Sequence, residues 1–476
     1  MPNTDSYDLI VIGSGPAGER GAVEAARLGK RVALIEKADS WGGASVLGGT
    51  LPSKTLREAA LQLSGWRKRG LAPAIDPQPP QLNIQEFLIR KQQVADSERG
   101  RIMAQLQHYQ VYRFQGTASF MDPFSVQVDD GNEQCLLTGG HILIATGSRP
   151  HHPDLFPFND RAVFDSDSVL AMEKIPESMA IIGAGVIGIE YACLFRALGV
   201  EVHLVHNRDQ ILHFMDAELS AMLVESLEAS GVRLHFNQRV DKFRRKGKVL
   251  QLQMDSNRII ECETALVTAG RISNVEMLRL DVAGVKTAER GQIEVNAKGR
   301  TSAAHIYAAG DVVGFPALAS TSMHQAREAV IDMFTVGGAA RPKPVLPFGL
   351  YTIPECSMVG ATEEELKASG ISYVVGRARY HNHARGMMIG EDVGRLKLLF
   401  HAGSGRLMGA HLIGDQSTEV IHVAVTAMMM EADIRLFLGT CFNYPTLSEM
   451  YQYAAYDALE QFPESLRHCM LDSRAD

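Results

Sequence analysis

Residues 7–28 read YDLIVIGSGPAGERGAVEAARL, and this stretch decides the fold. Its first six residues form an apolar strand, and a glycine-rich turn then leads into an alanine-rich helix. Gly13 permits the tight turn, Gly15 lets a pyrophosphate approach the backbone at the positive end of the helix, and Gly18 lets helix and strand pack closely. The order of strand, glycine turn and helix predicts an α/β unit that binds a dinucleotide.

A second strand, residues 31–35, follows this helix and ends at Glu36. Glu36 lies near the distance from the turn at which a carboxylate meets a ribose hydroxyl in such units. Its negative charge favours a dinucleotide whose adenosine ribose carries no phosphate.

The same pattern returns further along the chain, in residues 180–205. A short apolar strand is followed by a second glycine turn, a helix that reaches residue 197, and a strand at residues 201–205. The glycines of this second turn are Gly183, Gly185 and Gly188. One such turn is weak evidence, but two copies with matched spacing are strong, so we expect two dinucleotide sites.

The two sites differ at the ribose position, because His206 stands where the first copy has Glu36. The loss of the acid removes the repulsion that would exclude a 2′-phosphate, and Arg208 and Arg196 lie nearby in sequence. We therefore expect the second site to accept NADPH. The alternative is that Arg208 is an ordinary solvated surface charge.

Three further segments place small residues at the ends of apolar strands. Gly147 lies in residues 142–150, and Gly270 lies in residues 266–271. Both segments are typical of points where a chain crosses between domains and passes close to a cofactor. In the third segment, residues 306–313, Asp311 follows an apolar strand that we expect to be buried. An acid at this place could hold a polyol hydroxyl.

Length and composition limit the remaining possibilities. A chain of 476 residues is too long for one hydrophobic core, so three domains are expected. The net charge of -8 provides no basic field for nucleic acid. No apolar run approaches a membrane span and no signal peptide is evident, so we expect a cytoplasmic protein.

The six cysteines contain no closely spaced pair. Their spacing therefore predicts neither a redox dithiol nor a metal site.

The order of these motifs resembles the pyridine nucleotide-disulfide oxidoreductase family. The motifs are GSGPAG from Gly13, PSK ending at Lys54, ATGSRP from residue 145, GAGVIGIE ending at Glu190, AGD ending at Asp311, and YTIPE from residue 351. The resemblance implies two Rossmann-like domains and an α+β dimerisation domain. The expected bounds are 1–155 and 276–345 for the FAD-binding part, 156–275 for the NAD(P)-binding domain and 346–476 for the dimerisation domain.

The resemblance also implies the cofactors and the assembly. The first glycine turn, with Glu36 and Asp311, is expected to bind FAD, and the second to bind NAD(P)H as substrate. The C-terminal domain is expected to form a homodimer.

The sequence departs from the family at its redox centre, since Ser45 and Thr50 stand where the family has cysteines. Hydroxyls cannot cycle between dithiol and disulfide. Tyr444 replaces the family's catalytic histidine before Pro-Thr, and Glu449 follows it; tyrosine is a poor base at neutral pH. We therefore expect a small-molecule electron acceptor that is not a disulfide.

Lys54 and Glu190 remain as the expected catalytic pair. We expect one active-site helix over residues 42–54. Lys54 lies one turn beyond Thr50 on that helix, and the family resemblance places it near the flavin, where a cation stabilises added negative charge. Glu190 would pair with it. The alternative is an ordinary surface ion pair.

These residues indicate an FAD-dependent NAD(P)H oxidoreductase. The acceptor favoured by the sequence is NAD(P)+, because the soluble transhydrogenase branch of the family is similar in its threonine at position 50 and its FNYPT segment at residues 442–446. That branch normally keeps the cysteine that Ser45 replaces. The alternatives are an NAD(P)H:quinone or other acceptor reductase and a slow flavin redox sensor.

Overall fold

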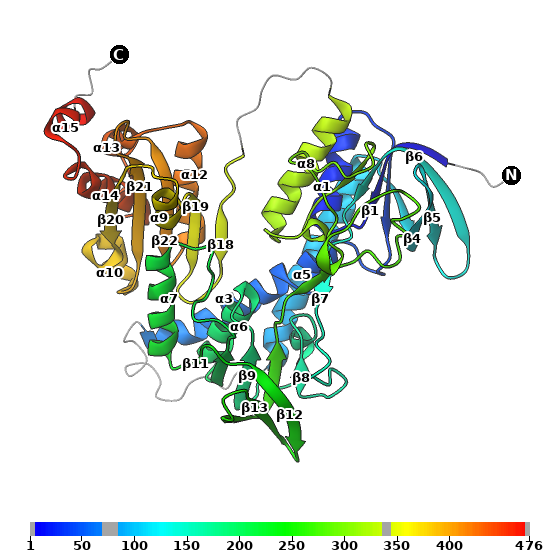
Figure 1. Cartoon of the computed structure of the whole chain (residues 1–476), viewed down its shortest axis with the longest axis horizontal. Coiled ribbons are helices and arrows are strands. Elements are labelled where there is room, and N and C mark those ends of the chain that lie inside the picture. The colour runs from blue at the N-terminus through cyan, green and yellow to red at the C-terminus, as the bar shows by residue number, and fades with distance from the viewer. Residues whose placement is uncertain (1–4, 69–83, 336–343, 472–476) are drawn as a thin grey trace.

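The computed structural model describes residues 5–68, 84–335 and 344–471. The expected domains also include residues 1–4, 69–83, 336–343 and 472–476, which lie outside the described residues. Figure 1 shows three parts, each built around its own sheet. None of the helices in the described ranges is both long and apolar enough to cross a membrane.

The first sheet has seven strands in the order β3-β2-β1-β6-β5-β4, with β17 paired to β6. Its strands are β1 (Asp5–Ile12), β2 (Val32–Glu36), β3 (Tyr112–Gln115), β4 (Thr117–Asp122), β5 (Ser125–Asp129), β6 (Gln134–Ile144) and β17 (Ile306–Ala308). The centre of β1 is apolar and fully buried, as expected for a parallel strand covered on both faces. Because β17 pairs with β6, the chain returns to this sheet after forming the second one.

Helices cover the first sheet. Its helices are α1 (Pro16–Arg27), α2 (Gly43–Leu47), α3 (Thr50–Lys68), α5 (Ile84–His108) and α8 (Ala319–Phe334). Figure 1 shows α1 and α8 side by side, and they share one buried apolar cluster with β1. Pro16 occupies the first turn of α1, where its missing N–H costs nothing.

The second sheet is parallel, in the order β11-β10-β9-β15-β8. It consists of β8 (Val163–Phe164), β9 (Ser178–Ile182), β10 (Glu201–Val205), β11 (Arg233–His235) and β15 (Thr264–Val267), with helices α6 (Val186–Ala197) and α7 (Ala217–Ser230). An antiparallel meander flanks it: β12 (Val240–Lys246), β13 (Val249–Met254) and β14 (Ile259–Cys262). The predicted helix through residue 197 and the strand at 201–205 are confirmed.

The chain passes between the first two sheets at one place. β7 (Ser148–Pro150) leads out of the first sheet and pairs antiparallel with β16 (Arg271–Ser273), which leads back. These are the two segments whose small residues predicted a crossing.

The third sheet is antiparallel, in the order β18-β19-β22-β21-β20. Its strands are β18 (Phe348–Leu350), β19 (Cys356–Gly360), β20 (Tyr373–Arg379), β21 (Arg395–His401) and β22 (Leu407–Ile413). The helices of this part are α9 (Glu363–Ala368), α10 (Ala384–Ile389), α11 (Ser417–Val420), α12 (His422–Met429), α13 (Ile434–Gly439), α14 (Met450–Leu459) and α15 (Glu464–Leu471). Strands and helices share one apolar core, so the expected α+β domain is confirmed.

Candidate active site

A cavity of about 840 Å³ opens where the first sheet, α3, α6 and β18 meet. Nine of the residues singled out in the sequence line it: Gly13, Gly15, Glu36, Ser45, Thr50, Lys54, Gly147, Glu190 and Asp311. They come from the first two parts of the chain, and Gly349 and Tyr351 of the third part complete the wall. The volume lies at the upper end of the range for small-molecule sites, which suits a dinucleotide.

The first glycine turn has no room for side chains at Gly13 and Gly18, whereas a Cβ at Gly15 would meet nothing closer than the Cα of Gly43 at 3.9 Å. A Cβ at Gly13 would lie 2.4 Å from the carbonyl oxygen of Ala145, and one at Gly18 would lie 1.7 Å from the carbonyl oxygen of Gly13. A Cβ at Gly43 would lie 2.7 Å from the Cα of Gly15. Gly15 therefore leaves room at the start of α1 for a phosphate to approach the backbone.

Glu36 is buried at the end of β2, with its carboxylate turned back to the glycine turn. Ser14 donates to Oε2 from its backbone N–H at 2.9 Å and from its hydroxyl at 2.7 Å, and the N–H of Ala38 donates to Oε1 at 2.9 Å. A carboxylate can accept about four hydrogen bonds, so capacity remains for a ribose hydroxyl. Binding of ribose by Glu36 stays a prediction.

Asp311 is held through a short polar chain that the sequence did not reveal. Ser148 donates its hydroxyl to Oδ2 of Asp311 at 3.0 Å, and Arg271 donates from Nε to the Ser148 hydroxyl at 2.7 Å. The Arg271 guanidinium lies 3.9 Å from the Asp311 carboxylate. Ser148 and Arg271 sit in the two crossing strands, and sequence reasoning noted their segments without assigning them a role.

Lys54 and Glu190 form an ion pair across the cavity, with 2.5 Å between Nζ and Oε2. Their side chains are 23% and 13% exposed, so this is not a surface pair. Glu190 also accepts from the N–H of Tyr351 at 2.9 Å, and Nζ of Lys54 lies 5.0 Å from the centre of the Tyr351 ring. The pair is present as expected, while its catalytic role stays a prediction.

The segment that carries Ser45 and Thr50 is broken, whereas the sequence suggested one helix through Lys54. Helix α2 ends at Leu47, because the N–H groups of Gly48 and Gly49 both turn back to the carbonyl oxygen of Ala44. Helix α3 then begins at Thr50. Ser45 donates its hydroxyl to the carbonyl oxygen of Gly42 at 2.9 Å.

Asp167 is a further cavity residue that sequence reasoning missed. A Cβ at Gly48 would lie 3.3 Å from its carboxyl carbon, so a glycine here leaves room for Asp167 beside the α2–α3 junction. Burial raises the pKa of Asp167, and the Arg271 cation only partly opposes this. The signal in the sequence was weak: Asp167 lies in the segment FDSDS at residues 164–168, and this short polar pattern by itself indicates no role.

The second glycine turn repeats the crowding of the first. A Cβ at Gly183 would lie 2.5 Å from the carbonyl oxygen of Thr268, and one at Gly188 would lie 1.9 Å from that of Gly183. Gly185 has no protein atom within 4 Å of such a Cβ. None of the three lines the large cavity, and open space at Gly185 leaves a second place for a pyrophosphate.

At the ribose position of this second site, the His206 side chain accepts a hydrogen bond from the backbone of the glycine turn, as Glu36 does from Ser14 in the first site. Its Nδ1 accepts from the N–H of Ala184 at 3.4 Å. Burial, with the Arg208 cation as a smaller cause, lowers the pKa of His206. The imidazole is therefore neutral at neutral pH, and Arg208, which is exposed, is the nearby charge.

Arg196 does not belong to this position, contrary to what its place in the sequence suggested. It lies in the last turn of α6, away from the glycine turn at the other end. There it donates to the carbonyl oxygens of Ser230 and Val200.

The two crossing glycines have left-handed backbones, with φ of +68° at Gly147 and +102° at Gly270. Gly147 lines the cavity and Gly270 does not. A Cβ at Gly270 would approach the Arg290 guanidinium at 3.1 Å. Their contact with a cofactor stays a prediction.

Tyr444 and Glu449 are not brought to the cavity within one chain. Tyr444 is 74% exposed, and both residues precede α14 in the C-terminal part. No cysteine lines the cavity, and Cys193, Cys262 and Cys356 are buried. Across the described ranges, no group of three or more His, Cys, Asp or Glu side chains is arranged to hold a metal ion.

Comparison with known proteins agrees with this geometry. Residues 7–326 match the family described as pyridine nucleotide-disulphide oxidoreductase, and residues 346–455 match its dimerisation domain. The chain is 40% identical over 459 residues to a soluble pyridine nucleotide transhydrogenase of Mycobacterium tuberculosis, covering 96% of this chain and 97% of that protein. It is 38% identical over 460 residues to that of Pseudomonas syringae pv. tomato, covering 96% and 99%.

Solved structures give the same result. LpdA of Mycobacterium tuberculosis superposes with a TM-score of 0.87 at 25% identity, covering 95% of this chain and 99% of that one. The HOCl-induced flavoprotein disulfide reductase RclA of Escherichia coli superposes with a TM-score of 0.83 at 25% identity, covering 94% and 98%. Fold, glycine turns and matches agree along nearly the whole chain: it belongs to the pyridine nucleotide-disulphide oxidoreductase family.

Proposed function

We propose that this chain is an FAD-dependent transhydrogenase that takes hydride from NADPH or NADH and passes it to NAD+ or NADP+. The family consists of FAD flavoproteins that use NAD(P)H, and the similar curated proteins are named for transhydrogenation. The observation that carries the proposal is the Lys54–Glu190 ion pair in a cavity whose wall presents Ser45 and Thr50 but no thiol. Without a dithiol, the reduced flavin has to pass its electrons directly to the acceptor.

FAD would supply the hydride-accepting and hydride-donating ring when bound. The protein's own residues would hold it and set its surroundings. Glu36 and Asp311 would accept hydrogen bonds from its hydroxyl groups, and the turn at Gly13–Gly18 would bind its pyrophosphate.

The Lys54 ammonium would stabilise negative charge that develops in the cavity during hydride transfer. Glu190 keeps that ammonium in place, and the N–H of Tyr351 in turn orients Glu190. Because these groups are partly buried, their field is screened less than that of a surface pair. The nicotinamide rings of the donor and the acceptor nucleotide would bind in turn at the same place beside the flavin, so no second acceptor pocket is needed.

The dimerisation-domain match supports a homodimer, which we propose as the assembly. The cytoplasmic location stays a prediction from the sequence.

The test is anaerobic mixing of purified holoenzyme with NADPH, followed by NAD+, a quinone or oxygen. We expect NADPH to reduce the enzyme and NAD+ to reoxidise it faster than the other two acceptors. Titration of accessible thiols before and after reduction serves as a control, and the count should not change. Faster reoxidation by the quinone would instead favour the acceptor-reductase alternative, and new thiols would contradict the thiol-free reaction.

A further inference from the structure

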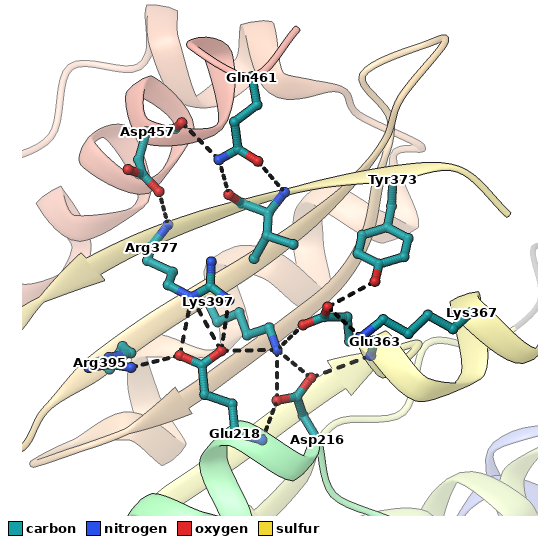
Figure 2. Close-up of polar contacts among 11 residues, drawn as sticks. Asp216, Glu218, Glu363, Lys367, Tyr373, Arg377, Arg395, Lys397, Asp457 and Gln461 are labelled. Carbon is teal, nitrogen blue, oxygen red and sulfur yellow. Dashed lines mark hydrogen bonds and ion pairs between the residues drawn. The ribbon is translucent and has the colours of Figure 1, made fainter.

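A group of charged side chains joins helix α7 of the second part to the antiparallel sheet of the third (Figure 2). We name it the Lys397 cluster. Its members are Asp216, Glu218, Glu363, Arg377, Arg395 and Lys397. Lys397 on β21 is 1% exposed, and Asp216 is 0% exposed. Such deep burial of charge persists only where the charges are paired.

The Lys397 ammonium is fully matched by carboxylates. Its Nζ donates to both oxygens of Asp216 at 2.9 and 2.8 Å, and lies 2.6 Å from Oε2 of Glu363 and 3.2 Å from Oε2 of Glu218. An ammonium has three protons to donate, and three carboxylates surround it.

Two guanidinium groups complete the balance of charge. Arg377 and Arg395 both donate to Glu218, at 2.9 and 2.6 Å. Three cations therefore meet three carboxylates. The cations all come from β20 and β21, whereas Asp216 and Glu218 come from the start of α7, where negative charge is favoured by the helix dipole.

Asp216 also ends the loop that carries the second ribose position. This loop starts after β10 at His206, passes Arg208, and ends where Asp216 caps α7 by accepting from the N–H of Glu218 at 3.1 Å. Just before Asp216, Phe214 packs on Phe348 of β18, with 4.6 Å between ring centres. The loop is thus fixed at one end by the second sheet and at the other by the third part of the chain.

The third part also forms a wall of the cavity. β18, which begins at Phe348, leads to Tyr351, whose N–H donates to Glu190 and whose ring covers the Lys54 ammonium. The third part therefore contacts the ribose loop through Phe348 and, separately, the Lys54–Glu190 pair through Tyr351.

We propose that Lys397 is a positioning residue for nucleotide binding. It locks the start of α7 onto the C-terminal sheet and so holds the His206–Met215 loop in the conformation that receives the nucleotide. This inference rests on the proposed function only for the identity of the second nucleotide site.

The test compares three single substitutions in the full-length holoenzyme. Lys397→Met removes the central cation. Asp216→Asn removes one charge but keeps the helix cap, because asparagine caps helices as well as aspartate. Lys367→Met is the control: Lys367 pairs with the same Glu363 at 2.9 Å, but its side chain is 62% exposed and it does not reach α7.

The readouts are the Kd of NADP+ by titration calorimetry, the KM for NADPH, the rate of hydride transfer at saturating NADPH, and the thermal midpoint. We expect Lys397→Met to raise the Kd and KM about tenfold and Asp216→Asn to raise them about threefold. The saturated rate should stay within about twofold, since the reacting groups are intact. The control should bind NADP+ like the wild type.

Unchanged Kd in both Lys397→Met and Asp216→Asn, with a lowered thermal midpoint, would overturn the proposal and leave the cluster a purely structural contact. If Lys397→Met does not fold, the Asp216→Asn result decides alone. Calorimetry needs no electron acceptor, so a wild type that binds NADP+ but does not pass hydride to NAD+ would refute transhydrogenation and leave this inference standing.

Discussion

At the scale of single residues, the cavity combines groups that lie far apart in the chain. Lys54 from α3 meets Glu190 from α6, and Tyr351 from the C-terminal part orients Glu190. Each contact is ordinary, but together they fix one ammonium in a partly buried place. That arrangement suits a reaction in which negative charge is delivered as hydride.

Replacing Lys54 by methionine should slow reduction of the bound flavin by NADPH at least about tenfold without releasing FAD, because the lost contribution is stabilisation of developing charge. Stopped-flow absorbance measures the rate, and the flavin-to-protein ratio measures retention. Lys298→Met, which removes an exposed lysine paired with Asp332, is the control. An unchanged rate would remove Lys54 from the mechanism.

We propose that the nucleotide preference depends on His206 and Arg208. Because the imidazole of His206 is neutral and Arg208 is exposed and cationic, NADPH should reduce the enzyme at least comparably to NADH. His206→Glu should restore the repulsion of the 2′-phosphate and lower the NADPH/NADH ratio of kcat/KM about tenfold, a free-energy change of about 1.4 kcal/mol.

Arg208→Ala should weaken NADPH selectively and leave the KM for NADH within about twofold. Steady-state kinetics with both nucleotides check these expectations. Exclusive use of NADH by the wild type, or ratios that neither substitution moves, would disprove the assignment of this position.

At the scale of elements, the two glycine turns separate packing from binding. In each turn the last glycine packs against the backbone of the first. A Cβ at Gly18 would lie 1.7 Å from the carbonyl oxygen of Gly13, and one at Gly188 would lie 1.9 Å from that of Gly183. The middle glycine, Gly185, faces open space. We therefore propose that the same motif contains residues needed for folding and a residue needed for the ligand.

Gly188→Ala should lower the thermal midpoint of the protein markedly, because the new Cβ overlaps the Gly183 carbonyl and pushes α6 off β9. Gly185→Ala should leave the midpoint within about 2 °C and raise the Kd of NADP+ instead, since the methyl group meets only the pyrophosphate. Calorimetric binding and thermal unfolding distinguish the two. Equal effects on both quantities would contradict this division.

At the scale of the whole molecule, the Lys397 cluster fastens the second part to the third. Burial by itself would raise the pKa of Glu218, but hydrogen bonds from Arg377 and Arg395 outweigh it and lower the pKa to about 2. For Glu363 burial is likewise outweighed, mainly by the hydrogen bond from Lys397, and its pKa falls to about 2. Both carboxylates are therefore charged in the folded protein at any ordinary pH.

This pKa difference makes stability depend on pH. The usual glutamate pKa is 4.5, so the unfolded chain binds protons first as the pH falls. The stabilisation is complete above about pH 5 and is lost progressively toward pH 2. Glu218→Gln should therefore flatten the fall of the thermal midpoint between pH 5 and pH 3, relative to the wild type.

The exposed Glu460→Gln is the matched control and should follow the wild-type curve. Differential scanning fluorimetry across that pH range is sufficient. Parallel curves for wild type and Glu218→Gln would show that the cluster does not control acid stability.

Much of the fold follows from local sequence. The glycine turns at Gly13 and Gly183 require strand, turn and helix in that order, because steric limits act between residues a few positions apart. The family resemblance extended this to three parts, and the sheets agree. The single helix expected through Lys54 was wrong, because the glycines at 48 and 49 end α2 before α3 begins.

The sequence by itself determined the two dinucleotide folds, the family, and the hydroxyls at Ser45 and Thr50. It also predicted that Lys54 pairs with Glu190, which the structure confirms. Only the tertiary structure decided that Asp167, Ser148 and Arg271 join the cavity, that Arg196 turns away from the second ribose position, and that Lys397 is buried among carboxylates. Local patterns fix backbone geometry over a few residues. Most of these contacts join segments separated by more than a hundred positions, such as Lys397 and Asp216, and Arg196 reaches Ser230 across 34 positions. Such contacts form only when separate sheets pack against one another, and no short pattern in the chain specifies them.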